Sequence, residues 1–255
     1  MRSYNYYHRL FFTFFSFVFF GIGGVIIGVL IYPVFWITIW NKEKRNRAGQ
    51  YFIHLMFKLF VGFMKLGGIF SLTIINKEQL REPGQFFIAT HPTLIDVVIM
   101  ISLLENVDCV VKAKLMNNPF TSGPLKAAGY IVNSAPQQLL DSCAQTLNHG
   151  HSLLVFPEGT RTKKLDKLYF QRGAAKIAIN AKHDLSPIVI KCQPRMLAKN
   201  VKWYKIPATK PEFTITIGER IKVEPFLGKN KSVNIQSRNL TNYLVNYFKE
   251  ELKIV

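Results

Sequence analysis

Any fold proposed for this sequence has to place a long uncharged stretch, because no side chain from Leu10 to Trp40 carries a formal charge. About 20 apolar residues suffice for a helix to cross the hydrocarbon core of a bilayer. The stretch is too long and too aromatic for a signal peptide, and no clean small-residue cleavage site follows it. We therefore expect it to stay in the mature protein as a membrane-embedded helical segment.

Two arrangements of this stretch are open, because glycines and a proline can kink it. These residues are Gly21, Gly23, Gly24 and Pro33. One arrangement is a tilted crossing, and the other is a hairpin of two half-buried helices that dips into one leaflet. Lys42, Lys44, Arg45 and Arg47 outnumber Arg2 and Arg9 on the opposite flank. By the positive-inside rule, the body of the protein is expected on the cytoplasmic side of the membrane.

The formal net charge of +18 requires an anionic partner, either nucleic acid or a lipid surface. The lysines are spread along the chain without a stacking-aromatic motif, and this argues against nucleic acid. Cys109, Cys143 and Cys192 are odd in number and far apart in sequence, which argues against a disulfide framework and fits a reducing compartment. Cys109 and Cys192 lie in apolar runs, where small buried side chains are expected.

From Ser71 onward, short apolar runs alternate with segments of helix length. The expected strands are Leu72–Ile75, Gln85–Ala89, Cys109–Lys112, Tyr130–Asn133, Ser152–Phe156, Ile188–Cys192 and Glu212–Ile217. This alternation predicts an α/β fold with a largely parallel sheet flanked by helices. A final amphipathic helix is expected over Asn234–Leu252. Ligands of such sheets bind beyond the carboxyl ends of the strands.

We divide the chain into a membrane anchor with a basic linker (1–50), an interfacial amphipathic helix (51–70) and a catalytic domain (71–255). In the middle segment His54, Lys58 and Lys65 fall on one helical stripe. Such a helix can lie along the membrane interface with its lysines among the headgroups. A helix packed against the domain is the alternative, and the amphipathic pattern does not separate the two.

His91 and Asp96 form the first constellation that suggests catalysis. His91 follows an expected strand, and Pro92 predicts a helix start directly after it. Asp96 lies about one and a half turns further on and can hold Nδ1, which leaves Nε2 as a general base. A base of this kind serves a hydroxyl that attacks a thioester, so no serine or cysteine nucleophile is needed. A purely structural pair is the alternative, because this spacing also occurs by chance.

A second polar cluster follows the expected strand Ser152–Phe156. It consists of Glu158, Gly159, Thr160 and Arg161. It combines a carboxylate, a glycine that lets backbone approach a ligand, and a guanidinium suited to binding phosphate. A surface ion pair at the strand end is the alternative.

These motifs resemble those of the membrane-bound glycerolipid acyltransferases of the 1-acylglycerol-3-phosphate acyltransferase family. The family signature is Asn-His, four residues and Asp, followed by Phe-Pro-Glu-Gly-Thr-Arg. The similarity covers roughly Ser71 to Ile217, including Phe170–Ala175 and Ser186–Val189. The resemblance implies that His91 is the base, that Asp96 is its partner, and that Lys112 lies near the acceptor phosphate. It also implies that the second cluster binds the acceptor, through Glu158, Gly159, Thr160 and Arg161.

Two positions depart from the family pattern. Thr90 replaces the asparagine before the histidine, and Asn133–Ala135 stands where the family commonly ends a block in Asp-Arg. That arginine is linked to recognition of the acceptor phosphate, and loss of one charge-assisted contact removes roughly 1.5–3 kcal/mol of binding. Lysophosphatidic acid is therefore one expected acceptor, and a related lipid such as an aminolipid or glycolipid is another.

The resemblance implies a membrane-bound O-acyltransferase that uses an acyl thioester of coenzyme A or of acyl carrier protein. We expect membrane lipids as partners, no metal and no organic cofactor. A metal hydrolase built from His91, Asp96 and Glu158 lacks the paired histidines of helix-borne zinc sites. The rival from another class is a catalytically idle, membrane-anchored lipid-binding protein.

Overall fold

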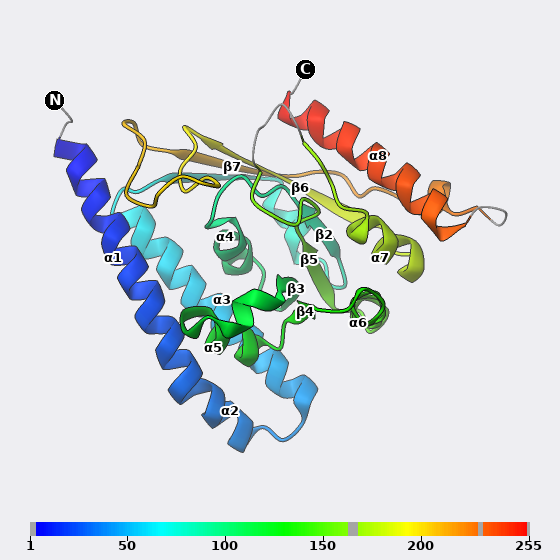
Figure 1. Ribbon diagram of the computed structural model, residues 1–255, viewed down its shortest axis with the longest axis horizontal. Helices are drawn as coiled ribbons and strands as arrows, with labels where there is room; N and C mark the ends of the chain where they lie inside the picture. The colour runs from blue at the N-terminus through cyan, green and yellow to red at the C-terminus, as the bar shows by residue number, and fades with distance from the viewer. Residues whose placement is uncertain (1–3, 163–167, 229–231, 254–255) are drawn as a thin grey trace.

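A computed structural model describes residues 4–162, 168–228 and 232–253. Its centre is a seven-stranded sheet with the order β1-β7-β6-β2-β5-β3-β4 (Figure 1). The strands are β1 Ser71–Ile75, β2 Phe86–Ala89, β3 Val107–Lys112, β4 Ile131–Asn133, β5 Ser152–Val155, β6 Leu185–Gln193 and β7 Glu212–Ile217. Each of them lies where the sequence predicts a strand, with shifts of a few residues at the ends.

The sheet is mostly parallel. The strands from β6 through β2, β5 and β3 to β4 pair in parallel, whereas β7 pairs antiparallel with β6 and parallel with β1. The parallel strands therefore end at one edge of the sheet, where β1 and β7 begin. This arrangement confirms the predicted α/β class.

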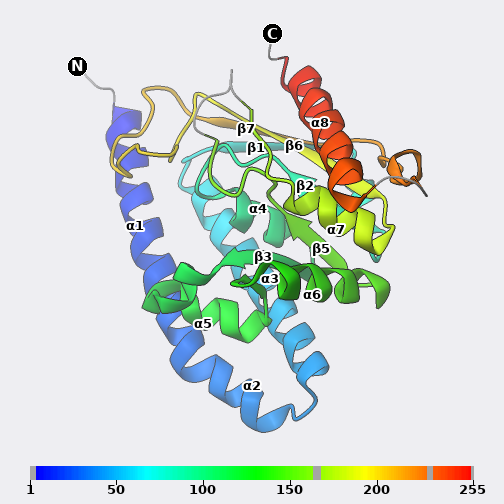
Figure 2. The same cartoon turned by 45° about the vertical axis from the view of Figure 1, so that its right-hand side comes forward.

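Helices cover both faces of the sheet (Figures 1 and 2). One face packs against α3 Lys42–Leu66, α4 Asp96–Leu103 and α5 Pro119–Ala128, and the other against α6 Pro136–Asn148, α7 Gly173–Ala181 and α8 Val233–Leu252. Within β2, Phe87 belongs to the first core and Phe86 to the second, because successive side chains of a strand point to opposite faces. Short 3₁₀ turns lie at η2 Lys77–Arg81, η3 Ala113–Asn117 and η4 Glu224–Phe226.

A long helical arm runs along one flank of this domain. It consists of α1 Tyr4–Ile26, a π-helical stretch η1 Ile27–Ile31 and α2 Tyr32–Thr38, and α3 returns beside it in the opposite direction (Figure 2). Among the described residues, the arm is the one helix long and apolar enough to cross a membrane, judged by length and composition. The π-helical stretch ends two residues before Pro33, which lacks a backbone donor.

The predicted basic linker is wrong, because residues 42–50 are the first turns of α3. The helix begins after Asn41, whose side-chain oxygen accepts a hydrogen bond from the Lys44 backbone N–H at 2.9 Å. Glu43 in the first turn adds a negative charge where the helix dipole favours one. The basic residues that looked like a linker therefore extend the helix.

The expected stripe on this helix is also corrected at His54. This residue is buried, and its Nδ1 lies 2.9 Å from the Ile101 carbonyl oxygen of α4. α3 packs against α1, α4 and α5, while Lys58, Lys65 and the side chains of Leu55, Leu59 and Leu66 are exposed. α3 therefore combines features of both alternatives: one side packs against the domain, and the other exposes apolar and lysine side chains.

Two glycines of the arm, Gly24 and Gly28, allow close packing against α5. A Cβ at Gly24 would lie 1.9 Å from the Phe120 carbonyl oxygen of α5, and one at Gly123 would lie 2.5 Å from the Gly28 Cα atom. By contrast, a Cβ at Gly23 would meet nothing within 4 Å. Gly24, Gly28 and Gly123 therefore let the backbones of the arm and α5 touch.

Candidate active site

The loop from β2 to α4 brings His91 and Asp96 together. The Asp96 carboxylate accepts hydrogen bonds from His91 Nδ1 at 2.9 Å, from the Thr93 backbone N–H at 2.6 Å and from the Thr93 hydroxyl at 2.5 Å. Its side chain is fully buried, whereas that of His91 is 16% exposed. Asp96 is also the first residue of α4, where the helix dipole stabilises a negative charge.

The helix start predicted directly after His91 is wrong. Residues 92–95 form a tight loop, and α4 begins at Asp96. The loop is closed by the two hydrogen bonds that Thr93 donates to Asp96. These bonds satisfy a backbone donor ahead of the helix, so the chain does not need to start the helix at Pro92.

The hydrogen bond to Asp96 assigns the tautomer of His91. A carboxylate only accepts hydrogen bonds, so Nδ1 is assigned as the donor and Nε2 keeps its lone pair. The His91 ring packs beside that of Phe156, with ring centroids 4.7 Å apart. The imidazole is thus held in one orientation, with its basic nitrogen unused by Asp96.

Glu158 joins the second motif loop to the first. Its Oε1 accepts hydrogen bonds from the His91 backbone N–H at 2.9 Å and from the Thr162 hydroxyl at 2.8 Å. The Thr162 backbone N–H in turn donates to the His91 carbonyl oxygen at 2.7 Å. Burial raises the pKa of Glu158 above its ordinary value, against the opposing effect of these two hydrogen bonds. The carboxylate predicted to bind the acceptor is thus directed at the backbone of the His91 loop.

Of the remaining residues of the second motif, Thr160 and Arg161 bond to the long connection between β6 and β7, residues 194–211. Gly159 has a positive φ of 63°, which glycine adopts without strain. The Thr160 hydroxyl accepts a hydrogen bond from Lys199 Nζ at 2.9 Å. Arg161 Nη1 donates to the Leu197 and Ala198 carbonyl oxygens at 3.0 and 3.2 Å, so part of this guanidinium is used within the protein.

Sequence reasoning missed Arg195, which lies on the same connection. Its Nη2 donates to the Pro92 carbonyl oxygen at 3.0 Å and to the Thr162 carbonyl oxygen at 2.6 Å. It therefore ties the two motif loops together from a third strand end. The available signal was its place just after β6, at the edge where the other two motifs end.

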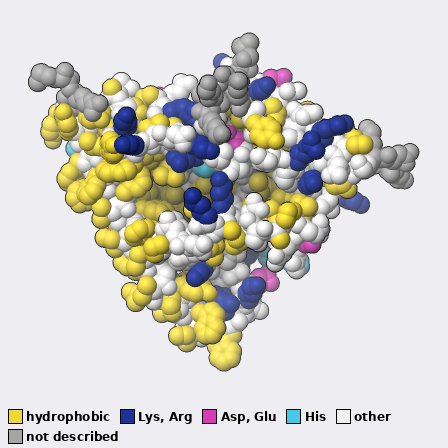
Figure 3. Space-filling model, in the orientation of Figure 1, with side chains coloured by type: hydrophobic (Ala, Val, Ile, Leu, Met, Phe, Trp, Pro, Cys, Tyr) yellow, Lys and Arg dark blue, Asp and Glu magenta, His cyan; other side chains and the backbone are white. Residues whose placement is uncertain are grey.

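Lys112 is the last residue of β3 and is exposed at this same edge. Asn133 ends the neighbouring strand β4 and pairs with Lys112 in register, and Ser134 and Ala135 follow it, all exposed. In the view of Figure 3, Lys and Arg side chains gather near the middle of the molecule, beside a broad apolar surface. The strand order thus brings Lys112 to the edge that carries His91, although no hydrogen bond or ion pair joins the two residues.

Residues 71–191 match the model of the Acyltransferase family. This part of the chain is an acyltransferase domain. The resemblance drawn from its motifs is confirmed, and the matched range includes His91, Asp96, Lys112 and residues 156–161.

Two known proteins resemble the chain that carries this acyltransferase domain. A 1-acyl-sn-glycerol-3-phosphate acyltransferase of Helicobacter pylori is 29% identical over 122 residues, which are 45% of this chain and 48% of that protein. The chain therefore matches about half the length of this curated relative. The crystal structure of the 1-acyl-sn-glycerophosphate acyltransferase PlsC from Thermotoga maritima shares the fold, with a TM-score of 0.64 and 16% identity over 96% of this chain and 97% of that one.

Thr90, which replaces the asparagine of the family pattern, forms hydrogen bonds to β6. Its hydroxyl accepts from the Ile190 backbone N–H at 2.8 Å and donates to the Ile190 carbonyl oxygen at 3.2 Å. The residue therefore fixes the end of β2 to the neighbouring strand.

Within the described ranges of the acyltransferase domain and its flanks, no group of three or more His, Cys, Asp or Glu side chains could hold a metal ion. The three cysteines are buried, and burial raises the pKa of each thiol to about 12. A thiol with so high a pKa is a poor nucleophile at neutral pH. The burial predicted for Cys109 and Cys192 is confirmed, and Cys143 is buried as well.

Proposed function

We propose that this protein transfers a fatty acyl group from an acyl thioester to the hydroxyl of a lysophospholipid-type lipid. The observation that carries the proposal is the contact between His91 and Asp96. It holds an imidazole with an available Nε2 at the carboxyl edge of a parallel sheet, where substrates of such folds bind. The family of the domain supports the same reaction class.

In this mechanism His91 Nε2 removes the proton from the acceptor hydroxyl as the oxygen attacks the thioester carbonyl carbon. The tetrahedral intermediate collapses, the C–S bond breaks, and the thiolate leaves. The imidazolium returns its proton to the departing sulfur, so the enzyme ends in its starting state. Asp96 keeps the ring in the required tautomer and stabilises the imidazolium.

For the acceptor we propose a lysophosphatidic acid or a related anionic lipid. Both relatives named above act, by their names, on an acylglycerol phosphate. Among the described residues, Lys112 and the unused nitrogens of Arg161 are cations that can meet a phosphate at the site edge, whereas Asn133–Ala135 contains no basic side chain. The donor is a thioester of coenzyme A or of acyl carrier protein, both acidic carriers that suit a chain with a net charge of +18.

We further propose that the arm lies in one leaflet with the catalytic domain on the cytoplasmic side. α1 buries its polar side chains Arg9, Thr13 and Ser16 against the domain and exposes its aromatic ones. The exposed set includes Phe11, Phe14, Phe15, Phe19 and Ile22. This polarity is the reverse of that of a helix facing water. A perpendicular crossing would also carry η3, α5 and their lysines into the hydrocarbon core, which is energetically costly.

The experiment that tests the proposal is an acyl-transfer assay of the detergent-solubilised protein. It uses labelled acyl-coenzyme A or acyl carrier protein with lysophosphatidic acid, other lysophospholipids, lyso-ornithine lipid and a glycolipid as acceptors. His91→Ala should lower the rate by about 10²- to 10⁴-fold, as expected for loss of a general base. The matched control is His149→Ala, which removes an exposed histidine before the amino end of β5, at the opposite edge of the sheet.

Labelled phosphatidic acid would identify lysophosphatidic acid as the acceptor. Another labelled product would identify a different acceptor and indicate a changed head-group pocket. If no acceptor in the panel is acylated, the alternative of an idle lipid-binding protein is favoured. A full rate for His91→Ala would contradict the assigned base.

A further inference from the structure

We propose that residues 199–205, in the connection between β6 and β7, bind the headgroup layer of an anionic membrane beside α1. This inference rests on the proposed membrane attachment of the arm, and it adds a second contact in the catalytic domain itself. The segment reads Lys-Asn-Val-Lys-Trp-Tyr-Lys. The connection as a whole is longer than the roughly 12–15 residues beyond which loops without secondary structure are usually functional or disordered.

The apolar side chains of this segment are exposed. The exposed fractions are 43% for Val201, 39% for Trp203 and 42% for Tyr204. A water-facing loop has no reason to present three such side chains together. Their exposure indicates that something covers them in the working protein.

The exposed surface is continuous with that of the arm. The Trp203 ring centroid lies 5.9 Å from that of Phe14 and 5.7 Å from that of Phe17, both in α1. Phe14 belongs to the outward aromatic face of α1. Whatever covers the arm therefore also reaches Trp203, and the segment is an extension of the membrane-facing surface.

The chemistry of the segment fits the boundary between headgroups and acyl chains. Trp and Tyr rings concentrate at that depth, because each has an apolar body and a polar atom. Lys202 and Lys205 are exposed on either side of these rings, and the Lys202 Nζ lies 5.7 Å from the Tyr204 ring centroid. Lysines at this level attract anionic lipids.

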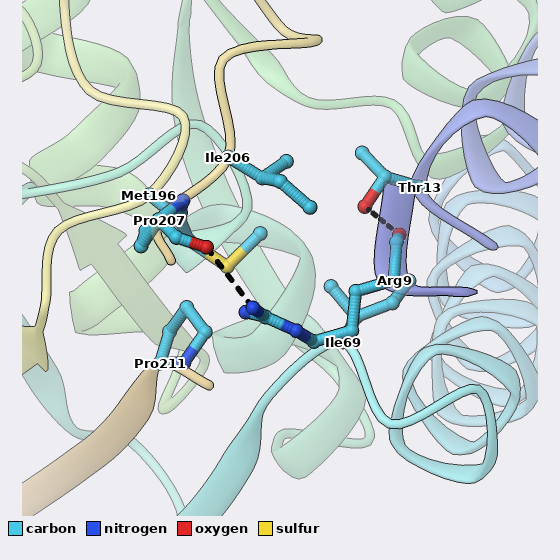
Figure 4. A pocket seen from close by; sticks show the side chains of 7 residues that line it. All are labelled: Arg9, Thr13, Ile69, Met196, Ile206, Pro207 and Pro211. Atoms are coloured by element: carbon cyan, nitrogen blue, oxygen red, sulfur yellow. Dashed lines mark hydrogen bonds between the residues drawn. The ribbon is translucent and has the colours of Figure 1, made fainter. Parts of the chain in front are cut away.

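The segment is held firmly at both ends. On one side Arg9 of α1 donates hydrogen bonds to the Thr209 carbonyl oxygen at 2.7 Å and to the Pro207 carbonyl oxygen at 3.1 Å. Figure 4 shows the Arg9 side chain reaching from α1 across a small apolar pocket to Pro207. On the other side are the bonds from Arg161 to Leu197 and Ala198 and from Lys199 to Thr160. Contact with headgroups thus fixes the height of the catalytic loops above the bilayer.

The test uses the full chain in vesicles with Trp203 as its sole tryptophan, in the double variant Trp36→Phe, Trp40→Phe. The vesicles are phosphatidylcholine with or without phosphatidylglycerol. We expect lipids brominated near the headgroup end of the acyl chain to quench Trp203, and the aqueous quencher acrylamide to quench it weakly. Phosphatidylglycerol should increase the quenching by brominated lipid and decrease the quenching by acrylamide.

The charge contribution is tested in the same background with Lys202→Gln, Lys205→Gln. This variant should lose most of the phosphatidylglycerol-dependent protection from acrylamide. The control is Arg238→Gln, Lys253→Gln, which removes one exposed cation from α8 and one directly after it, on the flank opposite the arm in Figure 1. The control should behave as the parent does.

If acrylamide quenches Trp203 fully while the protein sediments with the vesicles, this inference is overturned. The proposed membrane attachment of the arm would still stand. Protein that does not sediment with vesicles would overturn both. Acyl transfer is measured separately in detergent, so failure of the proposed reaction is distinguishable from failure of the lipid contact.

Discussion

The Glu158 carboxylate lies 2.9 Å from the His91 backbone nitrogen, so the glutamate of the second motif supports the histidine of the first. The link is completed by Thr162, which donates to Glu158 through its hydroxyl and to the His91 carbonyl oxygen through its backbone N–H. Arg195 adds bonds to the backbones of both loops. The two motifs thus form one hydrogen-bonded unit around the imidazole.

Replacement of Glu158 by Gln should keep this unit and leave stability at pH 7 equal or higher. Because burial raises the pKa of Glu158, its charged form costs folding free energy. The contribution of Glu158 to the free energy of unfolding is therefore fully present below the ordinary glutamate pKa of about 4.3 and is lost as the pH rises through the raised value. Gln still accepts both hydrogen bonds and removes this dependence. Thermal unfolding followed against pH measures the difference.

Glu158→Ala is the contrasting variant. It leaves the His91 backbone N–H without its acceptor and should cost about 1–3 kcal/mol at pH 7. Equal destabilisation by Gln and Ala would show that the carboxylate charge is required by the fold.

Asp96→Asn should lower the acyl-transfer rate by roughly 10²-fold or more, because the ring of His91 loses the acceptor that sets its tautomer. The expected control is Thr93→Ser, which keeps a hydroxyl that can donate to Asp96. Rates measured from pH 5 to 9 separate a changed base from a misfolded protein. An Asp96→Asn variant with the parent pH profile and rate would exclude a role for this carboxylate in catalysis.

Lys112→Gln should raise the KM for a phosphate-bearing acceptor by about ten- to a hundredfold, as expected for loss of one charge-assisted contact. The KM for a neutral acceptor should stay unchanged. Lys77→Gln is the control, since this exposed lysine follows β1 at the opposite edge of the sheet. A KM that rises equally for both acceptors would indicate a general effect on the site.

Gly24→Ala should destabilise the contact between the arm and α5 by about 1–3 kcal/mol, because the added methyl group meets the Phe120 carbonyl oxygen. Gly23→Ala is matched in chemistry and in helix, and it has free space around its Cβ. It should be neutral or stabilise by up to about 1 kcal/mol. Thermal unfolding in detergent compares the two, and equal midpoints would contradict the packing assigned to Gly24.

The strands and the pairing of His91 with Asp96 could be predicted because they depend on local apolar runs and short spacing. The start of α3 could not, because its basic first turn resembles a linker until the Asn41 cap is seen in place. The inward direction of Glu158 and the role of Arg195 also escaped prediction. Both depend on which strands lie side by side, and this is decided by the whole sheet.

The bond from Arg9 to Thr209 joins residues 200 positions apart in the sequence. During synthesis Arg9 leaves the ribosome well before Pro207 and Thr209, so its acceptors are absent until the connection between β6 and β7 has been made. Until then two nitrogens of its guanidinium lack these acceptors, whereas the Thr13 and Ser16 hydroxyls already donate to carbonyl oxygens of α1 itself. An isolated arm would bring the charged guanidinium into lipid at a cost. If the arm lies in the membrane as proposed above, it takes its final position only when the domain behind it has folded, so membrane attachment and folding are completed together.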